Sequence, residues 1–156
     1  MAVRFHEKDV RAMGRDASGV PGRRLRDGDE VIAADIARDD TELLVITENG
    51  YGKRTPLHEY RKTKRGAMGV TTVKLTEARG GLAGALVVRE GQALMLMSNA
   101  GTVIRTPVQQ IRRAGRSTQG VKVMRPREGE VVSAIARVVE SDEGAENGAP
   151  DAVPAD

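Results

Sequence analysis

Lysine and arginine side chains gather in three segments of this chain, residues 6–15, 57–65 and 108–116, which we call the first, second and third basic loops. Lys and Arg bind phosphate oxygens without reading the base sequence, and the counterions released on binding contribute affinity. We therefore predict that these loops, with bases of the adjoining strands, contact the backbone of duplex DNA. The predicted DNA-binding residues are Lys8, Arg11, Arg15, Lys53, Arg54, Arg61, Lys62, Lys64, Arg65, Arg105, Arg112, Arg113 and Arg116.

Residue patterns for catalysis, metals and cofactors are missing from the sequence. The chain has no cysteine, and His6 and His58 stand without a second histidine or a carboxylate cluster at metal-ligand spacing. No GxxxxGK[ST] phosphate loop is present, so we expect that the chain does not itself use ATP. The sequence therefore predicts a binding protein with no catalytic residue, no metal and no cofactor of its own.

Apolar stretches in the sequence are short. The longest, such as 131–139, fall far below the roughly 20 residues of a membrane span, and no N-terminal stretch resembles a signal peptide. Only three residues are aromatic, which disfavours single-strand binding by base stacking. We expect a cytoplasmic protein without a membrane partner.

Charge is distributed unevenly along the chain, although the net charge is only +3. All 25 bases lie at or before Arg137, with 16 acids, so residues 1–138 carry +9 and residues 139–156 carry −6. Residues 50–127 hold 16 bases against 3 acids. This imbalance favours a polyanionic partner over the alternative, a solvated surface without a partner.

A repeat of 50–51 residues organises these charges. Three series recur in one register: Arg4, Arg54 and Arg105; Arg15, Arg65 and Arg116; and the pairs Gly19-Val20, Gly69-Val70 and Gly120-Val121. Residues that recur at one fixed period indicate stacked units of the same structure. The repeat divides the chain into unit one (1–41), unit two (42–91), unit three (92–139) and an acidic tail (140–156), which we expect to be disordered.

Each complete unit has the pattern of four short strands. An Asn-Gly turn at 49–50 separates two of them, and Pro56 ends the second, because proline cannot donate to a strand ladder. We expect strands at Ala2–Phe5, Gly19–Leu25, Val31–Ile36, Leu43–Thr47, Tyr51–Thr55, Gly69–Leu75, Leu82–Val88, Ala93–Ser98, Thr102–Thr106, Gly120–Met124 and Val131–Val138. Four strands in about 50 residues are typical of a propeller blade. The sequence predicts an all-β, propeller-like partial ring, with two complete blades and one partial blade.

Strand arginines have an alternative to phosphate contact. Arg4, Arg54 and Arg105 lie between small or apolar neighbours inside expected strands. An arginine in that position pairs with an acid of a neighbouring unit as readily as it contacts DNA. The sequence leaves both roles open.

Three sequence runs carry a resemblance to a known family. Two of them, ITENGYGKRTPLHEYRKTKRGAMGV and SNAGTVIRTPVQQIRRAGRSTQGVKVM, resemble the last blades of the C-terminal domain of the DNA gyrase A subunit. AVRFHEKDVRAMGRDASGV resembles the blade before them, so the resemblance covers roughly residues 1–139, and the acidic tail fits the same subunit. The resemblance implies a β-pinwheel, a disc whose blades exchange a strand with their neighbours and whose basic rim wraps duplex DNA. It also implies a place in an ATP-driven type II topoisomerase that introduces negative supercoils.

Further implications concern partners and differences from the family. The expected partners are duplex DNA, the rest of the gyrase A subunit and the gyrase B subunit, at the chromosome in the cytoplasm, with ATP and magnesium used elsewhere in the holoenzyme. The family's QRRGGKG-type box is not present, and KRGAMG at 64–69 is its degenerate counterpart. Two alternatives stay open: the homologous subunit of topoisomerase IV, and a propeller used as a platform for binding other proteins.

Overall fold

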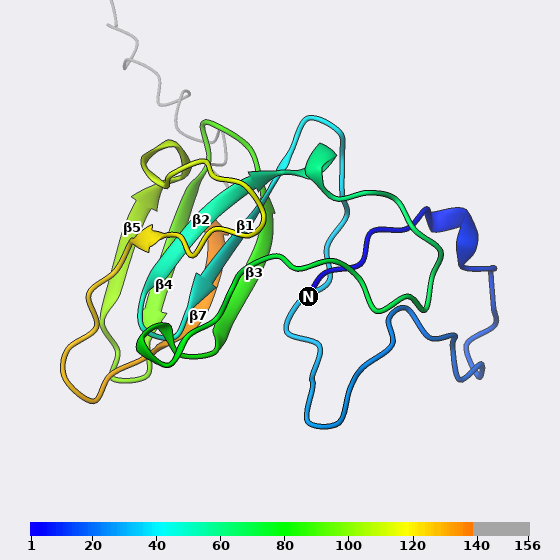
Figure 1. Ribbon diagram of the computed structural model, residues 1–156, viewed down its shortest axis with the longest axis horizontal. Coiled ribbons are helices and arrows are strands. Elements are labelled where there is room, and N and C mark those ends of the chain that lie inside the picture. Colours follow the sequence, from blue (N-terminus) through cyan, green and yellow to red (C-terminus); the bar gives the residue numbers. More distant parts are fainter. Residues whose placement is uncertain (139–156) are drawn as a thin grey trace, which may run out of the picture.

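The computed structural model describes residues 1–138, and within this range the secondary structure is strands and short 3-10 turns (Figure 1). The expected all-β fold is confirmed. The seven strands of residues 1–138 are β1 (Glu42–Thr47), β2 (Tyr51–Pro56), β3 (Leu82–Val88), β4 (Ala93–Ser98), β5 (Val103–Pro107), β6 (Val121–Lys122) and β7 (Val132–Val138). The 3-10 turns are η1 (Glu7–Asp9), η2 (Leu57–Glu59), η3 (Glu77–Arg79) and η4 (Val108–Gln110).

The strands form two antiparallel sheets, and each sheet is built on the three strands of one complete unit. In the first sheet the order is β3-β1-β2-β6, and in the second it is β5-β4-β7. The turn between β1 and β2 places Gly50 at φ +81°, and a Cβ there would lie 2.1 Å from the carbonyl oxygen of Met124. Only glycine fits such a position, because a side chain would meet backbone of the next unit.

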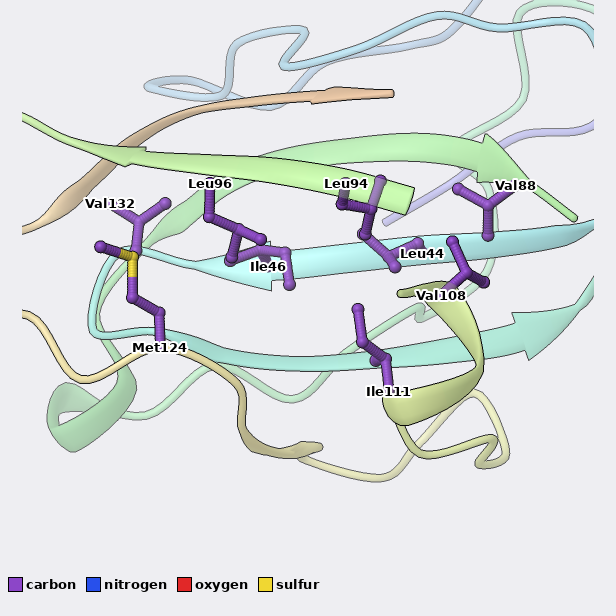
Figure 2. Packing of buried hydrophobic residues seen from close by; sticks show 9 residues of the cluster. All are labelled: Leu44, Ile46, Val88, Leu94, Leu96, Val108, Ile111, Met124 and Val132. Atoms are coloured by element: carbon purple, nitrogen blue, oxygen red, sulfur yellow. The ribbon is translucent and has the colours of Figure 1, made fainter. Parts of the chain in front are cut away.

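The hydrophobic core lies between the two sheets. Figure 2 shows Leu44 and Ile46 of β1 close to Leu94 and Leu96 of β4, and all four are 0% exposed. Burial of each such side chain contributes about 1.5–3 kcal/mol to the stability of the fold. The sequence pattern placed these alternate strand residues in the core because successive side chains of a strand point to opposite faces.

Short segments of one unit pair with the strand of the unit before it. The backbone N–H of Ala2 donates to the carbonyl of Val70 and that of Val70 to Ala2, both at 2.8 Å. One unit further on, β6 pairs with the first residues of β2, with Val121 opposite Gly52. We call these contacts the first and second junctions. They are the exchange between blades that the family resemblance implies.

Glycines at the two junctions confirm that the same contact is made twice. Gly69 has φ +90° and Gly120 has φ +77°. A Cβ on Gly69 would lie 2.3 Å from the carbonyl oxygen of Ala2, and one on Gly120 would lie 2.6 Å from that of Gly52. Each glycine therefore permits the same close approach of two backbones, 51 residues apart.

Unit one differs from the expectation of a partial blade with strands of its own. Ala2–Phe5 contributes only bridges at Ala2 and Arg4, and Gly19–Leu25 and Val31–Ile36 form no strand. In the complete units, the last strand pairs with the first strand of the same unit. Residues 1–41 hold no counterpart of that first strand, so the backbone of 31–36 has no ladder to join (Figure 1).

Strand lengths also differ from the prediction within the complete units. Gly69–Leu75 is reduced to the single bridge at Val70, and Gly120–Met124 to the two residues of β6. Both segments cross to another unit, where only a few residues lie beside the accepting strand. The remaining expected strands agree with the structure to within one residue at each end.

Candidate nucleic-acid interface

The second and third basic loops begin from equivalent buried anchors. Each follows the proline that ends β2 or β5 and opens with a 3-10 turn, η2 or η4. Leu57 and Tyr60 are buried in the second loop, and Val108 and Ile111 are buried at the matching positions of the third. These apolar side chains fix the start of each loop against the sheets. Burial raises the pKa of the Tyr60 hydroxyl.

The bases of each loop stand on backbone that is hydrogen bonded to the preceding unit. In the third loop the carbonyl of Arg112 accepts from the N–H of Arg54 at 3.1 Å, and the N–H of Ala114 donates to the Arg54 carbonyl at 2.9 Å. In the second loop the N–H of Thr63 donates to the carbonyl of Arg4 at 2.8 Å. The loops are therefore held in place as parts of the junctions, although their sequence is that of polar coil.

Exposed bases lie along these fixed loops. Arg61, Lys62 and Lys64 of the second loop and Arg112 of the third are exposed, and their side chains form no ion pair within residues 1–138. Arg113 is also exposed, while its Nε contacts Glu42. In the first loop, Lys8, Arg11 and Arg15 are exposed on a segment that has no preceding unit within the chain.

Lys53 is the clearest departure from the predicted DNA-binding set. Its side chain is 0% exposed, and its ammonium group donates to the carbonyls of Gly115 and Arg116 in the third basic loop. Burial lowers the pKa of Lys53 to about 8, while the charge of Glu59 raises it and that of Arg116 lowers it. The position is incompatible with phosphate contact, and Lys53 instead ties the third loop to β2.

Arg54 is also inside the protein. Its Nη1 donates to Glu42 at 2.7 Å and to Glu90 at 3.1 Å, and its Nε donates to the carbonyl of Ile111 at 2.8 Å. Burial alone would lower the pKa of Arg54, but its hydrogen bonds to the two carboxylates raise that pKa overall. Glu42 bridges Arg54 and Arg113, so one buried acid organises the base of the third loop.

Arg4 repeats this arrangement in unit one. Its guanidinium donates to the carbonyl of Leu57 at 2.8 Å and to Asp39 at 2.7 Å. Of the two roles left open by the sequence, Arg4 and Arg54 therefore have the structural one. Their acidic partners belong to their own unit, however, and it is the carbonyl partners, Leu57 and Ile111, that belong to the neighbouring unit. Arg105, the third member of the series, is exposed on β5.

Arg65 and Arg116 fasten the loops to the unit before them. Arg65 donates to the carbonyls of Pro21 at 2.8 Å and Asp9 at 3.1 Å, and Arg116 donates to the carbonyl of Thr71 at 3.2 Å. Both side chains belong to half-buried residues. Their recurrence at 51-residue spacing reflects the repeated junction, and their guanidinium donors are used at least in part within the protein.

Glu42 and Glu59 organise the loops, and neither is among the functional residues predicted from the sequence. Glu42 holds Arg54 and Arg113, and the Glu59 carboxylate accepts from the backbone N–H of Arg116 at 3.2 Å. One signal was present for Glu42, an acid at the first position of an otherwise apolar strand. For Glu59 no local signal exists, because its partner lies 57 residues away.

The described part of the chain contains no candidate metal site. Among residues 1–138, no group of three or more His, Asp or Glu side chains lies close enough together to hold a metal ion. No helix in residues 1–138 has the length and hydropathy that a membrane span requires.

The fold and the site together define a class: a propeller-type repeat protein whose units exchange segments and present a basic loop at each exchange. The family model for the DNA gyrase C-terminal domain, a beta-propeller, matches residues 1–38, 41–89 and 92–138. The chain belongs to this family.

Relatives and solved structures agree with this assignment. The DNA gyrase A subunit of Staphylococcus epidermidis is 44% identical over 143 residues, which are 90% of this chain and 16% of the relative. The Staphylococcus aureus counterpart is 43% identical over 147 residues, 93% of this chain and 17% of the relative. The chain thus spans about a sixth of the length of these curated relatives.

Two solved structures have the same fold. A DNA gyrase A C-terminal domain superposes with a TM-score of 0.80 at 28% identity, covering 86% of this chain and 46% of that one. The C-terminal domain of DNA topoisomerase IV has a TM-score of 0.80 at 26% identity, covering 86% and 42%. The partial ring expected from the sequence is consistent with this coverage, because the chain matches less than half of each domain.

Proposed function

We propose that this chain is a duplex DNA-binding module of a type II topoisomerase, equivalent to part of the gyrase A C-terminal region. The observation that carries the proposal is the repeated junction, which fixes exposed, unpaired bases of the second and third loops on backbone bonded to a neighbouring unit. Bases held in this way contact phosphates with little loss of loop entropy, and they read no base sequence. Binding is therefore sequence-tolerant.

Within the whole enzyme, the module supports DNA wrapping and ATP-dependent negative supercoiling, together with the rest of the gyrase A subunit and with the gyrase B subunit. It acts in the cytoplasm, on the chromosome. Gyrase is favoured over topoisomerase IV because the curated relatives at 43–44% identity are gyrase subunits, whereas the two solved domains have equal TM-scores.

A salt series with two matched triple variants tests DNA binding. One variant replaces Arg61, Lys62 and Lys64 with alanine, and the control replaces three other exposed bases, Lys74, Arg125 and Arg127. Both variants lose the same charge. Affinity for a duplex is measured by fluorescence anisotropy between about 50 and 200 mM salt, where each lost phosphate contact reduces the log–log slope by about 0.9.

The loop variant should bind all duplexes more weakly and with a flatter slope, and the control should keep the parent's slope. Equal slopes in the two variants would remove the second loop from the interface. No binding by the parent at low salt would favour the protein-binding platform instead. Wrapping is tested separately: a plasmid relaxed by a nicking-closing enzyme in the presence of the chain should show a shifted topoisomer distribution.

A further inference from the structure

A lysine is enclosed at the second junction, at a position where the other two units have an apolar residue. The repeat aligns Lys53 with Val3 of unit one and Ile104 of unit three. The first junction forms its backbone hydrogen bonds beside Val3, without a buried amine. Burial of an amine costs free energy that an apolar side chain does not. The backbone pairing of a junction therefore does not require the lysine.

Hydrogen bonding around Lys53 suits an uncharged amine as well as an ammonium group. Its Nζ donates to the carbonyl of Gly115 at 2.6 Å and to that of Arg116. An ammonium group has three N–H donors, whereas a neutral amine has two. Within residues 1–138 the side chain of Lys53 has no third acceptor and no ion pair. Both protonation states therefore fit beneath the third basic loop.

Two charged groups of opposite sign face Lys53. The carboxylate of Glu59, in η2, favours the charged ammonium, and the guanidinium of Arg116, in the third loop, disfavours it. Burial has the largest effect and lowers the pKa of Lys53 to about 8. The two protonation states thus interconvert within a mildly alkaline range, where a further charge near the loop changes their ratio.

Other elements around Lys53 add no charge that competes with this effect. On β1 the residue opposite Lys53 is Val45. On β6 the ammonium group of Lys122 lies 4.0 Å from the centre of the Tyr51 ring, so it is directed to that side chain. The hydroxyl of Tyr60 is buried and its pKa is raised, so it stays neutral in the range where Lys53 titrates.

DNA bound to the third loop would bring phosphates close to Lys53. The loop exposes Arg112 and Arg113, and its backbone carbonyls at 115 and 116 are the acceptors of the Lys53 amine. Charges within about 10 Å, the Debye length at 0.1 M salt, are only partly screened, and a buried charge is screened less. The phosphates therefore favour the ammonium form, whose hydrogen bonds to the two carbonyls are also stronger than those of the amine.

We propose that Lys53 is a positioning residue of the DNA interface, and that duplex binding by the third basic loop is linked to uptake of one proton from solvent by the enclosed amine of Lys53. The lone pair of Nζ accepts the proton, and no other bond changes. Because linkage is reciprocal, protonation strengthens DNA binding to the same extent that DNA binding favours protonation. The inference rests on the proposed DNA-binding function.

Calorimetry and fluorescence anisotropy measure the linkage with the full chain and a short mixed-sequence duplex at about 50 mM salt. Titrations at about pH 8, in two buffers of different ionisation enthalpy, should show uptake of about 0.3 to 0.4 proton per bound chain. Affinity should fall about two- to fivefold between pH 7 and pH 9. Lys53→Met should remove this uptake and this fall. Lys74→Met, which loses the same charge at an exposed site, should retain both.

The pH dependence separates positioning from a purely structural role of Lys53. If Lys53→Met only loosened the loop, its affinity would be lower by the same factor at both pH values, and the fall with pH would remain. The amino terminus titrates in a similar range, but it is the same in all three chains. Thermal unfolding verifies that each variant is folded.

A measurement on the parent alone gives a second readout. The NMR resonance of the Lys53 Cε carbon reports its protonation directly, and its titration midpoint should move to higher pH when the duplex is bound. The proposal is wrong if the parent binds DNA without proton uptake, if this midpoint does not move, or if Lys53→Met keeps the parent's uptake and pH dependence. Absence of DNA binding by the parent at low salt would instead reject the proposed function, and the linkage with it.

Discussion

Lys53 provides the sharpest test of the structure, because the sequence pattern predicts an exposed base and the fold buries it. Its ammonium group lies inside the second junction and donates to two carbonyls of the third basic loop. Replacement by methionine keeps the length and apolar stem of the side chain but removes the charge. The informative quantity is the difference in free energy of unfolding between the variant and the parent, followed over pH.

The lowered pKa of Lys53 sets the direction in which the stability of the parent changes with pH. Lys53 has a pKa of about 8 in the folded chain and about 10.5 when unfolded, so between these values the unfolded state binds more protons. The stability of the parent therefore rises with pH across this window. A shift of this size corresponds to at most about 3 kcal/mol, and solvent near the loop reduces it.

Between about pH 7 and pH 9.5, linkage predicts that the parent gains up to about 2 kcal/mol from Lys53 alone. The methionine variant cannot gain this amount, so it should lose up to about 2 kcal/mol of stability relative to the parent over the same interval. The upper pH of 9.5 lies below the ordinary tyrosine pKa of about 10. This matters because the raised pKa of Tyr60 lowers stability as pH rises through the tyrosine range.

Urea unfolding followed by far-UV circular dichroism measures the difference at both pH values. Lys74→Met is the control, since Lys74 is an exposed lysine, and its difference from the parent should not change with pH. Other groups that titrate in this range, such as the amino terminus, cancel in the comparison. An equal, flat difference for both variants would refute the lowered pKa of the buried Lys53.

Three further predictions concern the acid bridge, the exchange and the tail. Glu42→Ala should destabilise the fold by about 3–5 kcal/mol in urea unfolding, because it leaves Arg54 buried without its main partner, whereas Glu90→Ala, at a largely exposed acid, should cost under about 1 kcal/mol. Gly120→Ala should destabilise by more than Gly129→Ala in thermal unfolding, since both have positive φ but only Gly120 lies against backbone; equal losses would contradict the close approach. Deleting 140–156, a stretch outside the described residues with six acids and no base, should strengthen DNA binding at low salt and have no effect at about 1 M salt; unchanged affinity at low salt would exclude competition by the tail.

Local patterns in the sequence were sufficient for the fold class, the repeat and the core. Alternation of apolar residues, turn glycines and strand-ending prolines act over a few residues, so they can be interpreted without tertiary structure. Apolar alternation along the expected strands predicts twelve largely buried residues, and in the structure six of them are buried and six are half-buried. They are Leu44, Ile46, Val70, Val73, Leu86, Val88, Leu94, Leu96, Val121, Val123, Val132 and Ile135.

Contacts between units decided what the sequence left open. β2 carries a loop of the next unit along its edge, so Lys53 and Arg54, which look like surface bases from their strand positions, are enclosed. The partners of Arg65 and Arg116 lie 44 or more residues away, beyond the reach of any local pattern. In unit one, the sequence pattern of a strand is present at Val31–Ile36, but no strand forms. A strand needs a hydrogen-bonding neighbour, and residues 1–138 provide none for this segment.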